Sequence, residues 1–143
     1  MFKLLSVLIA VFAASNCMAS EWSKLVRTAD HKHTLMVDIE SIRFSPYGNT
    51  TDPAKSKWKV TANMKIVDGN TEAIFLTGID VQDCVDKQSG PVISIFPDST
   101  SKTYTWTKDG TKMYDIQGQF LCSYARETIR RKKHEDEKHR IML

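Results

Sequence analysis

Two cysteines are the residues of this sequence whose chemistry is most sharply defined. Cys84 and Cys122 have no neighbouring His or Cys at metal-ligand spacing, and they do not form the Cys-x-x-Cys motif of redox pairs. In an exported chain such an even pair is expected to form a disulfide. The closed loop of about 39 residues would stabilise the fold by about 4 kcal/mol in the chain-entropy view.

Three lysines form a candidate binding face. Lys57, Lys59 and Lys65 alternate with apolar residues over 57–67, so they project from one polar face of a predicted strand. They could engage an acidic partner, a glycan sulfate or the bacterial surface. The favoured interpretation is a solvated outer face, because an antiparallel sheet commonly has one polar side.

The other reactive side chains lack the spacing of a catalytic or metal site. His31 and His33 could share a strand face and hold a metal with Asp30 or Asp38. Two histidines are a weak signal, and a solvated turn is favoured. No nucleophile elbow, phosphate loop or zinc signature occurs in the sequence. We therefore expect a protein that is not an enzyme, with no catalytic residue, metal or cofactor.

The first 19 residues have the composition of a secretory signal peptide. Lys3 precedes an apolar run over 4–14, and the small residues Cys17 and Ala19 stand at positions −3 and −1 of a cleavage site after Ala19. Lipidation of Cys17 is the alternative, although the residues before it fit a lipobox poorly. No second hydrophobic span follows, so no transmembrane span is expected. The chain is expected to be exported, to the periplasm or the cell surface.

The rest of the chain has the pattern of a sheet. Turn-forming residues over 45–56 predict a loop, and Gly78 is expected to mark a bulge. Consecutive strands joined by short turns predict antiparallel pairing. About six strands are expected, at 22–28, 34–40, 57–67, 73–81, 92–96 and 102–107.

A helix is expected after the last strand. From Tyr114 the period of the apolar residues changes, and Ile116, Phe120 and Tyr124 share one helical face, with Asp115 as a cap at the start. We expect this face to pack on the sheet. The predicted fold class is therefore α+β, an antiparallel sheet of about six strands packed by one C-terminal helix, with one disulfide.

Length and charge fix the domain organisation. Of 143 residues, 41% are hydrophobic and 26% are charged, and the net charge is +3. We expect a signal peptide at 1–19, a single domain at 20–129, and a charged tail or helix extension at 130–143. The small net charge does not indicate nucleic-acid binding. A protein partner is expected, and the sequence leaves the oligomeric state open.

Several short motifs occur in a recognisable order between Glu21 and Ala125. They are Glu21-Trp22 after the leader, Val37-Asp38-Ile39-Glu40-Ser41-Ile42, Trp58-Lys59-Val60, Cys84, Trp106 and the segment to Gly118, and Cys122. In this order the chain resembles the surface-adhesin protein E-like family of bacterial exported proteins. It departs from the family in its long segment 45–56 and in the extension 126–143.

The resemblance implies an antiparallel sheet with a packed helix, an exported location and, for named members, adhesion to host proteins. It carries over no ligand residue, because the matching positions are structural. Asp38 and Ser41 are expected to set the turn after a strand. The leading expectation is an exported, non-enzymatic binding protein of the bacterial envelope. The alternatives are a periplasmic accessory or inhibitor module with a bacterial partner, and a small hydrolase.

Overall fold

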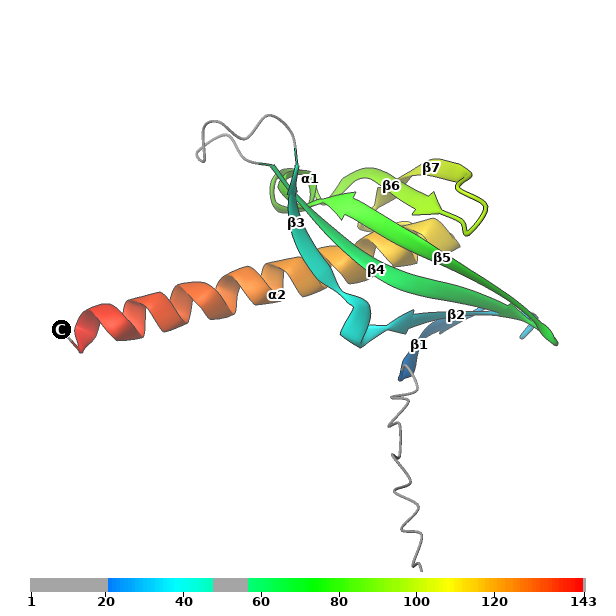
Figure 1. The fold of residues 1–143 in the computed structure, drawn as a ribbon, viewed down its shortest axis with the longest axis horizontal. Coiled ribbons are helices and arrows are strands. Elements are labelled where there is room, and N and C mark those ends of the chain that lie inside the picture. The colour runs from blue at the N-terminus through cyan, green and yellow to red at the C-terminus, as the bar shows by residue number, and fades with distance from the viewer. Residues whose placement is uncertain (1–20, 48–56, 143) are drawn as a thin grey trace, which may run out of the picture.

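An antiparallel sheet covered on one side by a long helix makes up the structure (Figure 1). It is a computed structural model that describes residues 21–47 and 57–142. The predicted signal peptide, with Cys17, lies outside these residues. The helical elements are the 3-10 turn η1 (Ile39–Ser41), α1 (Val81–Asp86) and α2 (Met113–Ile141). The strands are β1 (Trp22–Arg27), β2 (His33–Asp38), β3 (Arg43–Tyr47), β4 (Lys57–Asp68), β5 (Thr71–Asp80), β6 (Ser89–Ile95) and β7 (Ser101–Thr107).

All strand pairs are antiparallel, as the sequence predicted. The order across the sheet is β1-β2-β4-β5-β6-β7, and β3 also pairs with β4. Strands β2 and β3 share the long strand β4 between them: β2 pairs with its C-terminal half and β3 with its N-terminal half. Gly69, with φ of 58°, makes the tight turn from β4 to β5, a conformation in which glycine carries no steric cost.

The sheet of about six strands is confirmed with one additional strand, β3, whose second half was assigned to the loop at 45–56. Its residue Phe44 lies opposite Val60 on the buried side of the sheet, which gives the segment an apolar anchor. Pro46 removes one backbone donor, and this is tolerated at the outer edge of a sheet. The turn-forming residues over 48–56, which dominated the prediction, lie outside the described residues.

The turn between β2 and β3 is built by the Asp38 and Ser41 side chains, as the sequence predicted. The Asp38 carboxylate accepts a hydrogen bond from the Glu40 backbone at 3.1 Å, and the Ser41 hydroxyl donates to the Asp38 carbonyl at 2.6 Å. The Ser41 hydroxyl in turn accepts from the Asn63 backbone at 2.8 Å. Between β2 and β3 the backbone hydrogen bonds to β4 are interrupted, and these side-chain hydrogen bonds take their place.

A second correction concerns α1, where the sequence predicted that a strand runs to Val81. Asp80 ends β5 instead and caps the helix, since its carboxylate accepts from the Gln82 backbone at 2.8 Å. The helix carries Cys84 inward, and its side chain is fully buried. A helix of six residues is too short for a 3.6-residue period to be visible in the sequence.

Helix α2 begins one residue earlier than predicted, and Asp115 does not occupy the capping position itself. Lys112 is the N-cap residue, and Asp115, three positions later, accepts from its backbone at 3.1 Å. The same carboxylate accepts from the Thr107 backbone at 2.9 Å. The Gln119 amide donates to the Thr107 carbonyl at 2.8 Å. Side chains of α2 therefore fasten its first turns to the end of β7.

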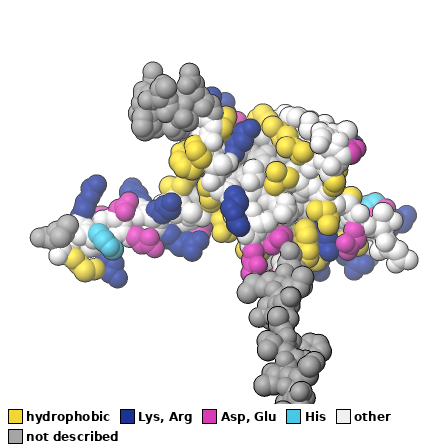
Figure 2. All heavy atoms as spheres, in the orientation of Figure 1, with side chains coloured by type: hydrophobic (Ala, Val, Ile, Leu, Met, Phe, Trp, Pro, Cys, Tyr) yellow, Lys and Arg dark blue, Asp and Glu magenta, His cyan; other side chains and the backbone are white. Residues whose placement is uncertain are grey.

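The second half of α2 projects from the domain (Figure 1). We call Ile129–Met142 the C-terminal arm, because every side chain in it is exposed. Charged side chains of both signs surround it (Figure 2). The segment 130–143 was predicted as a solvated helix extension or a frayed tail, and the structure has the helix extension, which runs to Ile141.

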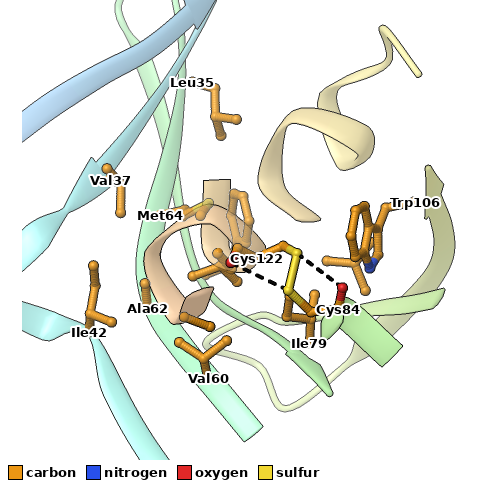
Figure 3. Packing of buried hydrophobic residues seen from close by; sticks show 14 residues of the cluster. Leu35, Val37, Ile42, Val60, Ala62, Met64, Ile79, Cys84, Trp106 and Cys122 are labelled. Atoms are coloured by element: carbon orange, nitrogen blue, oxygen red, sulfur yellow. Dashed lines mark hydrogen bonds between the residues drawn. A yellow bond between two sulfur atoms is a disulfide. The ribbon is translucent and has the colours of Figure 1, made fainter. Parts of the chain in front are cut away.

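The core lies between the sheet and the first half of α2, and the disulfide crosses it. Cys84 and Cys122 are bonded, with their Cα atoms 5.3 Å apart. Figure 3 shows the bond among buried side chains of the sheet, with Trp106 beside it. The predicted disulfide is confirmed, and it joins α1 to α2. The largest fully buried side chains include Trp106, Leu35, Met64, Leu121, Val37, Val60 and Val92.

The buried stripe of α2 is rotated from the predicted one. Its centre is formed by small and medium residues, while Ile116, Phe120 and Tyr124 are only partly buried and flank it. A narrow stripe lets the helix axis approach the sheet closely, and the larger side chains then fill its margins. The buried residues of α2 are Asp115, Gln117, Gly118, Leu121, Cys122 and Ala125.

A polar cluster lies within this apolar interface. The Gln117 side-chain oxygen, on α2, is 3.4 Å from the Thr77 hydroxyl on β5 and 3.4 Å from the Ser94 hydroxyl on β6. All three side chains are buried. Buried hydroxyls need partners, so this oxygen fixes the rotation of α2 relative to two central strands.

Replacing Gln117 by leucine is expected to lower the free energy of unfolding by about 2 kcal/mol, because two buried hydroxyls lose their acceptor. Urea unfolding measures the change. Adding Thr77→Val and Ser94→Ala to the Gln117→Leu variant should restore at least half of the loss, since no polar group is then left without a partner. A single variant as stable as the natural chain would contradict the role given to the cluster.

Candidate functional site

Helix α2 covers one face of the sheet, and the opposite face, here called the open face, has no helix over it in the described residues. In Figure 1 the strands lie in front of α2, so the viewer looks onto the open face. Opposite residues of antiparallel strands point to the same side. The pairing of Thr61 with Gly78, and of Gly78 with Ile93, therefore places these three in one row across the open face.

A hollow of about 280 Å³ lies at the centre of the open face. Its apolar walls come from β5 and β6, and Leu76 and Ile95 are exposed by 39% and 43%. Ile93 completes the wall opposite Gly78. Figure 2 shows hydrophobic side chains exposed on this side of the domain. We call this feature the Gly78 hollow.

Gly78 forms the floor of the hollow and does not mark the predicted bulge. The register of β4 and β5 is continuous through it, with Gly78 opposite Thr61. A Cβ atom added at Gly78 would lie 2.9 Å from the Thr61 Cγ2 atom and 3.4 Å from the Val60 carbonyl oxygen. The missing side chain therefore both permits the close strand contact and leaves the space above it open.

Polar side chains close one end of the hollow. The Tyr47 hydroxyl donates to the Asp80 carboxylate, and the Lys59 ammonium lies 4.7 Å from the centre of the Tyr47 ring. The other oxygen of Asp80 caps α1. Each of these groups thus has a structural contact: Tyr47 holds β3 against the end of β5, and Lys59 lies on its ring.

The three lysines predicted as a binding face do lie on the open face, but they differ in their surroundings. Lys59 lines the Gly78 hollow. Lys65 lies near the other end of β4, 3.1 Å from the Glu72 carboxylate and 4.7 Å from the centre of the Trp22 ring. Lys57 is exposed at the start of β4. The structure therefore brings only one of them to the hollow.

The apolar surface continues past the hollow along β5 and β6. Leu76 and Ile95 line a second, shallower depression together with Phe96 and Ile74, and Ile74 is 46% exposed. Ile74, Leu76 and Ile95 form one apolar patch on the open face, whereas Phe96 packs against the buried ring of Phe75. Sequence reasoning missed it, although a signal was present: Ile74-Phe75-Leu76 is apolar at consecutive positions, so this strand has apolar side chains on both faces.

The histidines considered as metal ligands are not gathered into a site. His33 Nδ1 lies 3.6 Å from the Asp68 carboxylate, and both side chains are exposed. His31 sits in the turn before β2 with φ of 58°. Within residues 21–47 and 57–142, no group of three His, Cys, Asp or Glu side chains is placed to hold a metal ion.

None of the helices in the described part of the chain is long and apolar enough to cross a membrane. Among the described residues, the Gly78 hollow and the patch around it combine a concave shape with exposed apolar side chains, the combination expected of a binding site. No protein-family model, no curated protein and no solved structure matches this chain.

Proposed function

We propose that the chain is an exported, non-enzymatic binding protein of the bacterial envelope, which takes a protein partner on its open face. The observation that carries the proposal is the apolar patch centred on the Gly78 hollow, with Leu76 and Ile95 exposed beside it. Contiguous apolar surface on a folded domain is typical of an interaction site.

The size of the hollow favours a protein partner over a small ligand. A volume of about 280 Å³ lies below the usual range for sites that enclose a drug-sized molecule. It is well suited to one or two side chains that anchor a larger interface. The charged side chains that line the hollow are Lys59, Asp80 and Asp83, which are of both signs, so a neutral, apolar anchor is the best match.

The polar groups beside the hollow support binding in preference to catalysis. Asp80 accepts hydrogen bonds from the Tyr47 hydroxyl and from the Gln82 backbone at the start of α1, so both of its oxygens serve the fold. A general base would instead need a lone pair directed at substrate. Export is supported by the leader composition and by the Cys84–Cys122 bond, since disulfides persist in oxidising compartments.

The test uses exported protein as bait for envelope extracts and for host-matrix extracts. Replacing Ile95 by glutamate should weaken capture of the partner at least about tenfold, because a charge must then be buried in an apolar contact. The matched control is Ser123→Glu, which adds the same charge on the exposed side of α2. Equal capture by both variants would refute the open face as the contact surface.

The side on which the partner is found separates adhesion from a periplasmic role. Protease treatment of whole cells should degrade the protein if it acts as an adhesin at the surface, and should spare it if it acts on a periplasmic partner. A partner from host matrix with a surface-exposed chain would support adhesion. Capture from the envelope extract alone would support the accessory or inhibitor role.

A further inference from the structure

The C-terminal arm concentrates the net charge of the chain. Ile129–Met142 contains six Lys or Arg residues and three Asp or Glu residues, a net charge of +3, which equals that of the whole sequence. Residues 1–128 therefore carry equal numbers of cationic and anionic side chains. Without Lys3 of the predicted leader the domain carries a net charge of −1, and the arm is a cationic projection from it, about 20 Å long at the rise of an α-helix.

The two arginines at the base of the arm share a single carboxylate as ion-pair partner. Arg130 and Arg131 both approach the Glu127 carboxylate, at 2.8 Å and 3.9 Å. The hydrogen bond from Arg130 holds the pKa of Glu127 below its ordinary value, so one anion is shared by two cations. The two contacts have the i, i+3 and i, i+4 spacings at which helical side chains pair.

The end of the arm is apolar. Ile141 is 81% exposed and Met142 is 69% exposed, which are the highest values among the exposed large hydrophobic residues. Lys138 and Arg140 lie beside them in the last turn. Figure 2 shows hydrophobic and basic side chains close together near this end of the molecule. Among the described residues, these two apolar side chains stay largely uncovered.

We propose that the C-terminal arm binds the surface of an anionic phospholipid membrane through its tip. Ile141 and Met142 would enter the boundary between head groups and acyl chains, and the cations behind them would contact the phosphates. Charge complementarity argues for this partner, since the arm is cationic and the domain carries a net charge of −1. The apolar tip argues for a membrane over a soluble polyanion, which offers no apolar layer.

The distribution of the apolar residues argues for contact by the tip. Ile129 and Ile141 are twelve positions apart in the helix, so at 100° per residue they lie about 120° apart around its axis. They cannot form one apolar stripe of a helix that lies flat on a membrane. The proposal is independent of the open face, which remains available for a protein partner.

Sedimentation of the exported protein with vesicles tests the proposal. Vesicles of phosphatidylcholine mixed with phosphatidylglycerol should bind the protein, vesicles of phosphatidylcholine alone should bind it far less, and added salt should weaken binding. Replacing Lys138 and Arg140 by glutamate should lower the partition coefficient by about tenfold or more, because these two cations lie beside the apolar tip. Replacing Lys24 and Lys108 by glutamate changes the net charge equally, but in the domain, and should have a small effect.

The tip variant separates a membrane from other anionic partners. Ile141→Ser with Met142→Ser should reduce vesicle binding by about tenfold, while Ile129→Ser should leave it unchanged. All these side chains are exposed, so unfolding temperatures should stay close to that of the natural chain. The proposal is wrong if anionic and neutral vesicles bind equally, if the tip variant binds like the natural chain, or if heparin is bound and vesicles are not.

Discussion

Removing the disulfide by Cys84→Ala and Cys122→Ala is expected to lower the free energy of unfolding by about 4 kcal/mol. The bond joins residues 38 positions apart, and a loop of this size restricts the unfolded chain by about that amount. Typical domains have a total stability of about 5–15 kcal/mol, so the variant should unfold at a much lower urea concentration. Both cysteines are buried, which adds the cost of the space they vacate.

Comparing oxidised and reduced natural protein separates the two contributions. Reduction breaks the cross-link and adds only two hydrogen atoms, so it should account for most of the 4 kcal/mol if chain entropy dominates. Because Cys84 and Cys122 are buried, a reductant should react mainly after unfolding. Two free thiols in the freshly isolated natural protein, or the same unfolding midpoint with and without reductant, would contradict the expectation.

The sequence predicted those parts of the fold in which one face of an element is buried and the other is wet. In β4 the side chains of Val60, Ala62 and Met64 are fully buried, and the residues between them lie on the open face. This alternation is set by the chain itself, because successive side chains of a strand point to opposite sides. The predicted disulfide likewise depended on cysteine count and compartment alone.

The parts that could not be predicted depend on neighbours. Strand β3 forms because β2 leaves the N-terminal half of β4 unpaired on that side, and β3 fills this position. The local composition, with Pro46, favoured a loop instead. Helix α1 is held against α2 by the bond between Cys84 and Cys122. In both cases tertiary contacts outweigh the propensity of a short segment.

The candidate site also could not be predicted from the sequence, because it depends on contacts between strands. Gly78, Ile93 and Leu76 are unremarkable as single residues, and only the register of β4, β5 and β6 places the two large side chains around the glycine. No period within one strand encodes that register. The lysines were predicted on the correct face, but the apolar patch beside them was not, because the strands were assumed to be polar on their outer side.

Gly118→Ala is expected to destabilise the fold by about 2–3 kcal/mol, although alanine is the better helix former by about 1 kcal/mol. Gly118 faces Trp106, and an added Cβ atom would overlap the Cβ, Cγ and Cδ2 atoms of that side chain. Trp106 is only 1% exposed and cannot turn into solvent. The destabilisation from overpacking is larger than the stabilisation from the higher helix propensity of alanine.

Ser123→Ala is the control, because Ser123 is exposed on the same helix and its replacement should change stability by less than about 0.5 kcal/mol. Thermal unfolding measures both variants, and near-ultraviolet circular dichroism reports whether the environment of Trp106 has changed. A Gly118→Ala variant that is as stable as the control, with the tryptophan signal intact, would mean that helix and sheet can separate without cost. The close contact between Gly118 of α2 and Trp106 of β7 would then not be what fixes the position of the helix.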